Sequence, residues 1–109
     1  MKRETSSEPP HTHQDLQVWK ESMSLMTELY RLTATFPKEE QFGLASQIRR
    51  SAVSVPSNIA EGAGRGGPRE FRQFLLIARG SLSELETQVL VPRNLGYAPD
   101  NEDIGRRIK

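Results

Sequence analysis

Arginine is the residue type in this sequence that best fits a binding function. Six arginines but only two acidic residues fall between positions 49 and 79, whereas the whole chain has a formal charge of only +1. If the residues from 68 onward form a helix, Arg69, Arg72 and Arg79 lie within about 80° of one another, which suits a ridge that contacts phosphates. The candidate nucleic-acid-binding residues are Arg50, Arg65, Arg69, Arg72 and Arg79.

Two other interpretations of these arginines stay open. A group of charges on a helix is also typical of an ordinary solvated face. Arg49 borders the apolar face of its predicted helix, where its planar guanidinium suits an ion pair with a carboxylate across a helix interface. Arg49 is therefore grouped with the candidate interface residues.

The glycine-rich segment at residues 62–68 matches a dinucleotide-binding pattern by spacing alone, with glycines at positions 62, 64 and 67. That fingerprint needs a strand before it, but a helix is predicted there. The Gly-Lys-Ser or Gly-Lys-Thr of a phosphate-binding loop does not occur in the sequence. We interpret the segment as a turn between two helices.

The remaining side chains with chemical potential are too few or too scattered for an active site. His11 and His13 supply fewer ligands than a closed zinc site needs, and the chain has no cysteine. Glu61 lies beside the glycine turn within reach of Arg65 or of a group on the first helix, and a structural ion pair is favoured over a catalytic acid. The sequence therefore predicts a protein that is not an enzyme, with no catalytic residue, cofactor or metal.

A single small domain must position the candidate arginines. Of 109 residues, 35% are hydrophobic and 27% are charged, so the core is expected to be thin and to gain from packing against neighbouring subunits. Residues 1–13 are predicted to be a disordered tail, because they lack apolar side chains after the first residue, and residues 14–109 a helical bundle domain. No apolar run is long enough for a membrane span and no export signal is recognised, so we expect a cytoplasmic protein without a membrane partner.

Apolar residues at three- and four-residue steps predict substantial helices at residues 14–34, at residues 44–62 and from residue 68 onward. The first helix has about twice the apolar arc of an ordinary surface helix, so it should contact partners on two sides. One of its stripes consists of Leu16, Trp19, Met23, Met26 and Tyr30, and the other of Val18, Leu25, Leu29 and Leu32.

Two prolines and the last segment modify this pattern. Pro56 falls inside the second helix and predicts a kink, or a break with Ser57 or Asn58 as a new cap. Pro92 should end or bend the third helix. Residues 100–109 begin with acidic and end with basic side chains, as suits one short helix. The residues alone therefore predict three long helices and a short fourth.

Apolar residues outside the main stripe of a helix are candidates for contacts between subunits. The first helix has a whole second stripe, and the third helix has leucine and isoleucine off its main stripe. We therefore predict self-association. The candidate interface residues are Trp19, Met23, Met26, Tyr30, Arg49, Leu76, Ile77 and Leu90.

Several segments together resemble one family of helical proteins. Residues 42–50 read Phe-Gly-Leu-Ala-Ser-Gln-Ile-Arg-Arg, residues 54–62 read Ser-Val-Pro-Ser-Asn-Ile-Ala-Glu-Gly, and residues 70–86 read Glu-Phe-Arg-Gln-Phe-Leu-Leu-Ile-Ala-Arg-Gly-Ser-Leu-Ser-Glu-Leu-Glu. A proline and an Asn-Ile-Ala-Glu-Gly ending inside an amphipathic helix are an unusual combination. Over residues 16–97 the chain resembles the four-helix-bundle family named after the 23S rRNA intervening-sequence protein.

The resemblance implies an antiparallel up-down four-helix bundle that forms a homopentamer and has no enzymatic activity. Relatives include the accessory variability determinant of diversity-generating retroelements, which associates with a reverse transcriptase and nucleic acid, so RNA, DNA and a reverse transcriptase are implied partners. Pro92 and the end of the sequence at Lys109 depart from the family pattern, which leads us to expect a short or truncated fourth helix beside a kinked second helix. A purely structural or protein-interaction oligomer without nucleic-acid binding stays the alternative.

Overall fold

The structure, a computed structural model, describes residues 13–97, which form three long α-helices and two 3-10 turns. In chain order these are η1 (His13–Asp15), α1 (Gln17–Ala34), η2 (Lys38–Glu40), α2 (Leu44–Gly64) and α3 (Pro68–Leu95). No strand occurs among the described residues, so the all-α prediction is confirmed. The predicted short helix at residues 100–109 and residues 1–12 of the predicted tail lie outside the described residues.

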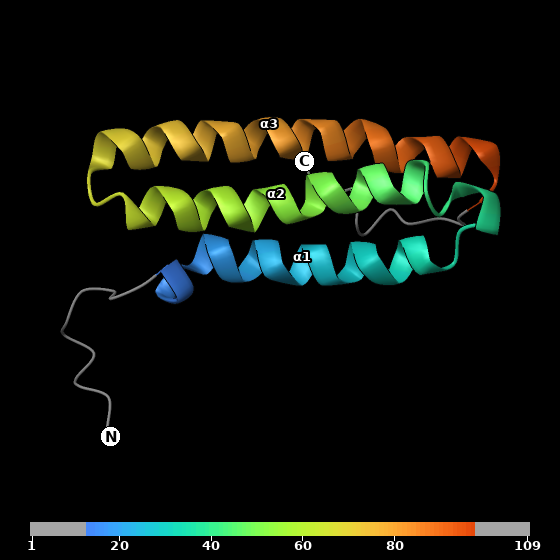
Figure 1. Cartoon of the computed structure of the whole chain (residues 1–109), viewed down its shortest axis with the longest axis horizontal. Coiled ribbons are helices and arrows are strands. Elements are labelled where there is room, and N and C mark those ends of the chain that lie inside the picture. Colours follow the sequence, from blue (N-terminus) through green and yellow to red (C-terminus); the bar gives the residue numbers. More distant parts are fainter. Residues whose placement is uncertain (1–12, 98–109) are drawn as a thin grey trace, which may run out of the picture.

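The three helices lie side by side, with α2 between α1 and α3, and successive helices run in opposite directions (Figure 1). No Cα atom of α1 lies within 8 Å of a Cα atom of α3, so each outer helix packs on α2 and not on the other. The described residues thus form three members of an up-down array. The four-helix bundle is not complete in this part of the chain.

Helix α1 begins three residues later than predicted, because residues 13–15 form the turn η1 instead. His13, which the sequence assigns to the tail, begins this turn. Its ring packs edge-on against Trp19, with 5.0 Å between the two ring centroids. The backbone amide of Leu16 donates a hydrogen bond of 2.9 Å to the His13 carbonyl, which joins the turn to the start of α1.

The connection from α1 to α2 is held by one buried aromatic residue and one amide side chain. Phe36 is buried in the core directly before Pro37. Gln41 Nε2 donates hydrogen bonds of 3.1 Å to the carbonyls of Thr33 and Phe36. Gln41 therefore satisfies backbone acceptors that the end of a helix leaves unpaired.

Helix α2 runs unbroken through Pro56, so the predicted break at Ser57 or Asn58 is wrong. A proline removes only one backbone donor, and Pro56 is buried within the helix array. Asn58 does not cap a new helix. Its side-chain amide donates hydrogen bonds to the carbonyl and the hydroxyl of Ser54, at 2.8 and 3.0 Å. The kink stays a prediction.

Helix α3 also continues through its proline, so the prediction that Pro92 ends the helix is wrong. Pro92 is fully buried, and the helix ends only at Gly96, which has a φ of 81°. The amide of Tyr97 donates a hydrogen bond of 2.8 Å to the Pro92 carbonyl, and the amide of Gly96 donates one of 3.2 Å to the Arg93 carbonyl. Gly96 thus ends the helix in the left-handed geometry that glycine adopts without strain.

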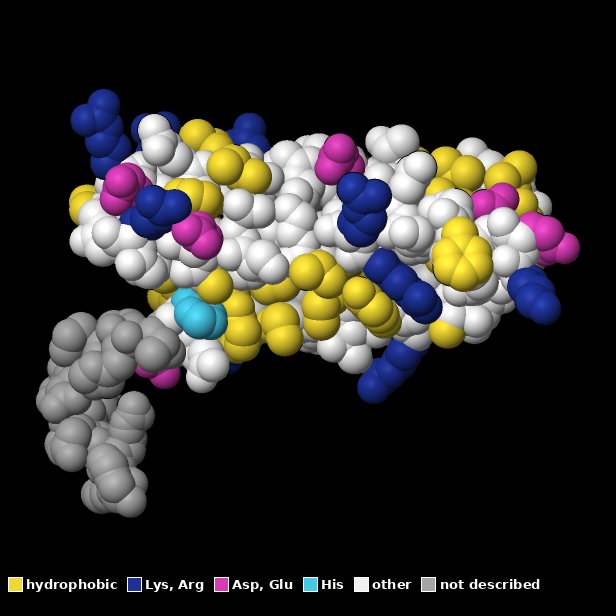
Figure 2. All heavy atoms as spheres, in the orientation of Figure 1, with side chains coloured by type: hydrophobic (Ala, Val, Ile, Leu, Met, Phe, Trp, Pro, Cys, Tyr) yellow, Lys and Arg dark blue, Asp and Glu magenta, His cyan; other side chains and the backbone are white. Residues whose placement is uncertain are grey.

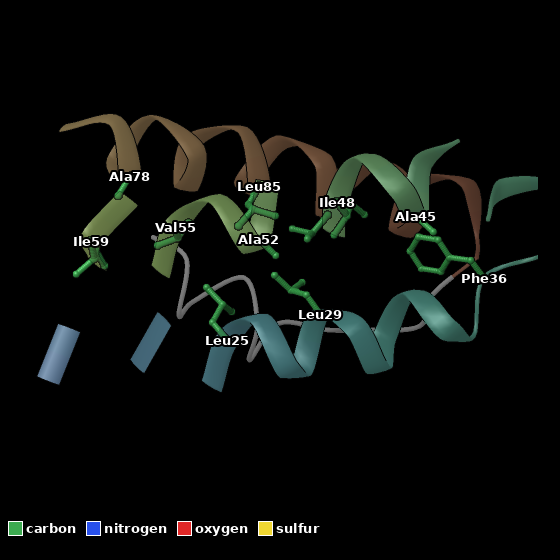
Figure 3. Close-up of a cluster of buried hydrophobic side chains, with 11 residues drawn as sticks. Leu25, Leu29, Phe36, Ala45, Ile48, Ala52, Val55, Ile59, Ala78 and Leu85 are labelled. Carbon is green, nitrogen blue, oxygen red and sulfur yellow. The ribbon is translucent and has the colours of Figure 1, made fainter. Parts of the chain in front are cut away.

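The core lies between α2 and its two neighbours (Figure 3). Leu29 of α1, Ile48 of α2 and Leu85 of α3 have no exposed surface. Ile48, Ala52, Val55 and Ile59 follow one another at three- and four-residue steps along α2 and are all buried, so the periodicity that predicted this helix also identifies its inward face. The buried cluster consists of Leu25, Leu29, Phe36, Ala45, Ile48, Ala52, Val55, Ile59, Ala78, Leu85 and Val89.

Helices α2 and α3 approach each other closely where small residues face the partner helix. A Cβ atom placed on Gly62 would lie 2.7 Å from the Cβ atom of Phe74 and 3.0 Å from Cδ1 of Phe71. Further along, the hydroxyl groups of Ser54 and Ser81 share a hydrogen bond of 2.8 Å. The α2–α3 contact therefore depends on the absence of a side chain at Gly62.

Candidate nucleic-acid and subunit interfaces

Helix α3 carries three of the predicted nucleic-acid-binding residues on its exposed surface. Arg69, Arg72 and Arg79 are all exposed, and Arg69 and Arg79 are about 15 Å apart along the helix axis. We call these three residues the α3 arginine ridge. The ridge begins in the first turn of α3, where the exposed carboxylate of Glu70 adds one opposing charge. A strand of nucleic acid lying along α3 would therefore meet a row of positive side chains with a net charge of about +2.

Arg65 is close to the ridge in sequence but is already engaged. Its guanidinium forms an ion pair of 2.8 Å with Glu61, and both side chains are half exposed. The same guanidinium lies over the ring of Phe74, 5.3 Å from its centroid. The ion pair predicted from the sequence is confirmed, and it leaves Arg65 with less charge to offer a phosphate than the ridge residues have.

Arg50 lies away from the ridge. Arg65, the residue just after α2, follows Arg50 by fifteen positions, which corresponds to about 22 Å along the helix. Arg50 lines a hollow beside Arg49 and Tyr30, whereas Arg79 lines a groove formed by all three helices. The five candidate arginines therefore do not form one surface in this chain.

Arg49 joins α1 to α2 within the chain. Its Nε donates a hydrogen bond of 2.7 Å to Thr33 Oγ1, and its Nη2 donates one of 3.2 Å to the Tyr30 carbonyl. The guanidinium lies over the Tyr30 ring, 4.9 Å from its centroid. Its partners are thus a hydroxyl, a carbonyl and an aromatic ring, and not the carboxylate that the sequence suggested.

The candidate interface residues on α3 are exposed. Leu76, Ile77 and Leu90 expose 50%, 51% and 44% of their surface, which is far more than a residue in a helix interface shows. On α1, Trp19 and Met26 pack partly against the core, and Tyr30 is 40% exposed. Figure 2 shows a row of hydrophobic side chains along α1 and further groups over α3. Apolar side chains therefore lie at both edges of the helix array.

A groove of about 510 Å³ opens between α1 and α3, with α2 as its floor. Val18 and Leu25 line it from α1, Val55 and Ile59 from α2, and Leu75 and Leu82 from α3. Glu21 and Arg79 contribute opposite charges to its lining. The sequence did not predict this groove, because it depends on the distance between α1 and α3.

A second hollow, of about 710 Å³, lies where the α1–α2 connection meets both helices. Phe42 in its lining has 97% of its surface accessible. Phe42 begins one of the segments that carry the family resemblance, but the sequence indicates no binding role for it. The lining residues are Tyr30, Gln41, Phe42, Ser46, Arg49, Arg50, Val53 and Ser54.

One hydrogen bond ties the end of α3 to the start of α2. The Tyr97 hydroxyl donates to Glu40 Oε2 at 2.9 Å, and Glu40 Oε1 accepts a bond of 3.3 Å from the Leu44 amide. The hydrogen bond to Glu40 raises the pKa of Tyr97 above its ordinary value near 10, and burial and the negative charges of Glu40 and Glu39 raise it further. Glu40 is therefore a structural carboxylate with two partners.

The described residues contain no arrangement typical of a metal centre or a membrane span. No group of three or more histidine and acidic side chains in residues 13–97 is placed to hold a metal ion. None of the helices in this range combines the length and the apolar character needed to cross a membrane. The features of this small helical protein that could bind a partner are therefore on its surface: the α3 arginine ridge, the exposed apolar side chains, the groove and the hollow.

The comparison with known families identifies that protein class more closely. The family model of the 23S rRNA-intervening sequence protein matches residues 14–106, which is most of the chain. The chain belongs to this family, and the resemblance predicted from the sequence is confirmed. A search of curated proteins finds no match.

Proposed function

We propose that this protein is a non-enzymatic, self-associating helical protein that binds nucleic acid through its arginine-rich surface. The observation that carries the proposal is the composition of the exposed side of α3. This one helix presents half-exposed Leu76 and Ile77 together with the three exposed residues of the arginine ridge. A helix that faced only water would not need the apolar side chains of Leu76 and Ile77. A purely apolar interface would not tolerate the three arginines of the ridge.

Self-association is supported by the position of the apolar residues at both edges of the array. The α1 edge carries Trp19 and Tyr30, and the α3 edge carries Leu76, Ile77 and Leu90. Contact between the α1 edge of one copy and the α3 edge of the next would be heterologous, which is the type of contact that closes into rings. Five copies is the number that the family resemblance implies.

A fourth helix fits the same proposal. The groove between α1 and α3 is apolar and open in the described part of the chain. Residues 100–109 carry apolar side chains at Ile104 and Ile108, four positions apart, so one helical face could cover part of the groove. The short fourth helix of an antiparallel four-helix bundle is our proposal for this segment.

Binding of nucleic acid is supported by the α3 arginine ridge and by repetition in an oligomer. A single ridge with a net charge near +2 binds weakly, but several copies held in one assembly act together. Each phosphate neutralised adds about −0.9 to the slope of log affinity against log salt on duplex DNA. We therefore expect sequence-tolerant binding that weakens steeply with salt, in a cytoplasmic protein whose implied protein partner is a reverse transcriptase.

The test is the triple variant R69Q/R72Q/R79Q, compared with the wild type by light scattering and by gel shift of labelled RNA and DNA. We expect an intact oligomer and a flatter salt slope for the variant, because all three side chains are exposed. A matched control, R31Q, removes one exposed arginine from α1 and should leave the slope close to that of the wild type. Failure of the wild type to shift either nucleic acid at low salt would reject the binding function.

The alternative is a structural or protein-interaction oligomer without nucleic-acid binding. It is favoured by the pairing of Arg65 with Glu61 and by the presence of Glu70 in the ridge, because both reduce the positive field at the start of α3. Loss of the oligomer in the triple arginine variant would support this alternative, since the ridge would then belong to a subunit interface. A monomeric wild type at micromolar concentration would reject self-association in either version.

A further inference from the structure

Phe42 and its neighbours form a surface feature that the proposed arginine ridge does not use. A phenylalanine with 97% of its surface in water is energetically unfavourable, and the other large hydrophobic residues of the described chain expose at most 59%. Phe42 lies beside a hollow that also includes Tyr30 and Val53, which expose 40% and 37% of their surface. The hollow therefore has one aromatic ring, that of Phe42, almost fully open to solvent, while Arg49 lies over the ring of Tyr30.

Two arginines give this hollow its charge, and its lining contains no carboxylate. Arg49 is fixed by its hydrogen bonds to Thr33 and the Tyr30 carbonyl and by its position over the Tyr30 ring. Arg50 follows directly, is exposed, and forms no ion pair within residues 13–97. One guanidinium is thus held rigidly against an aromatic ring, and the next is free to contact a ligand.

The neighbouring acidic residues reduce this positive charge but do not cancel it. Lys38 and Glu39 in η2 have opposite charges and are both exposed. Glu40 keeps its negative charge, because its two hydrogen-bond donors, the Leu44 amide and the Tyr97 hydroxyl, are neutral. Together with the two arginines of the hollow, Lys38, Glu39 and Glu40 give three positive and two negative charges, a net charge of +1. Figure 2 shows basic, acidic and hydrophobic side chains near the end of the array where η2 joins α1 to α2. The local charge favours an anionic ligand.

We propose that this hollow binds single-stranded nucleic acid, with a base stacked on Phe42 and a neighbouring phosphate held by Arg50. Exposed aromatic rings beside arginines are the combination that binds single strands, because every base has a face that can stack. Bases within a duplex are already stacked on one another, so the hollow should distinguish single strands from duplex. The inference rests on the proposed nucleic-acid binding and adds a second site, remote from the α3 arginine ridge.

The experiment compares two variants of Phe42 by fluorescence anisotropy, with a labelled oligothymidine and a labelled hairpin duplex at one fixed low salt concentration. F42L keeps an apolar side chain and loses the ring, whereas F42Y keeps the ring. Because the side chain is almost fully exposed, neither change should affect folding. We expect F42L to weaken binding of the single strand by roughly five- to a hundredfold and F42Y to bind like the wild type. Binding of the duplex should be the same for all three proteins.

A direct readout of stacking is available because the chain has a single tryptophan. In the double variant W19F/F42W the only indole stands at position 42, and stacking against a base should quench its fluorescence when oligothymidine is added. R50Q should weaken binding of the single strand, and R31Q, which removes an exposed arginine outside the hollow, should not.

Three outcomes would overturn the inference. Equal binding of oligothymidine by F42L and the wild type, in a protein whose binding is lost in R69Q/R72Q/R79Q, would reject the hollow and keep the proposed function. Equal loss of single-strand and duplex binding in F42L would reject base stacking. A change of oligomer size in F42L would show that a second copy of the chain occupies the hollow. If the wild type bound neither probe, the proposed function itself would fail.

Discussion

The two contacts made by the central helix α2 are built in different ways. On the α3 side, Gly62 and the Ser54–Ser81 pair allow the two backbones to approach, so the contact depends on small size. On the α1 side, Arg49 and Gln41 extend across to the end of α1 and hydrogen-bond its last turns. The first contact is thus defined by shape and the second by polar side chains.

The two contacts should therefore tolerate different kinds of substitution. A contact between close backbones has no room for added atoms, and its one polar pair, Ser54 and Ser81, fits because both side chains are small. A contact made by long side chains tolerates changes in size, but it loses hydrogen bonds when one donor is removed. We therefore expect the α2–α3 contact to be sensitive to volume and the α1–α2 contact to be sensitive to the deletion of donors.

The largest effect is expected for G62A. The added Cβ atom would lie 2.7 Å from Phe74 Cβ, so the helices must move apart, at a cost of about 1–3 kcal/mol in the free energy of unfolding. The matched control is G80A, because nothing lies within 4 Å of a Cβ atom at that position in the middle of α3. Alanine should stabilise α3 there by about 0.5–1 kcal/mol. Opposite shifts in urea denaturation would support the shape argument, and stabilisation by both changes would refute it.

A smaller effect is expected for R49M on the other side of α2. Methionine retains part of the apolar stem but removes the hydrogen bonds to Thr33 and Tyr30, with a loss of about 1–2 kcal/mol. R50M at the neighbouring exposed position should stay within about 0.5 kcal/mol of the wild type.

A double-mutant cycle isolates the Arg49–Thr33 hydrogen bond. The changes R49M and T33V should show a coupling energy of at least about 0.5 kcal/mol, because the two side chains are in direct contact. Additive effects in urea denaturation would mean that the hydrogen bond does not stabilise the α1–α2 contact.

The sequence predicted the parts of the fold that depend on local pattern. The stripe from Ile48 to Ile59, the start of α3 at Pro68 and the Glu61–Arg65 pair all rest on spacings of a few residues, and all three are present. The predictions of a break at Pro56 and of a helix end at Pro92 failed because local rules do not include burial. At Pro56 and Pro92 the surrounding packing outweighs one missing hydrogen bond.

The candidate surfaces were less predictable, because each depends on residues far apart in the chain. The Tyr97–Glu40 hydrogen bond joins residues 57 positions apart, and no periodicity indicates such a pair. Phe42 stands out only through its exposed fraction, which the sequence does not contain. The separation of Arg50 from the α3 arginine ridge likewise follows from the positions of α2 and α3, and not from the number of arginines.

The smallest effect concerns a third kind of contact, the hydrogen bond from Tyr97 to Glu40, and it should appear only at high pH. The pKa of Tyr97 is raised in the folded state by this hydrogen bond, so the unfolded chain releases the phenolic proton first as pH rises. The stabilisation is therefore complete below the unfolded pKa near 10 and is lost as pH rises through the folded pKa. Between about pH 8 and pH 11, the wild type should lose more stability in urea denaturation than Y97F, in which no phenol titrates at this position.

E40Q keeps an oxygen acceptor but removes the charge, so it should bring the pKa of Tyr97, followed by tyrosinate absorbance, closer to its ordinary value. Parallel stability profiles for the wild type and Y97F would show that this hydrogen bond does not link the end of α3 to the start of α2 in solution.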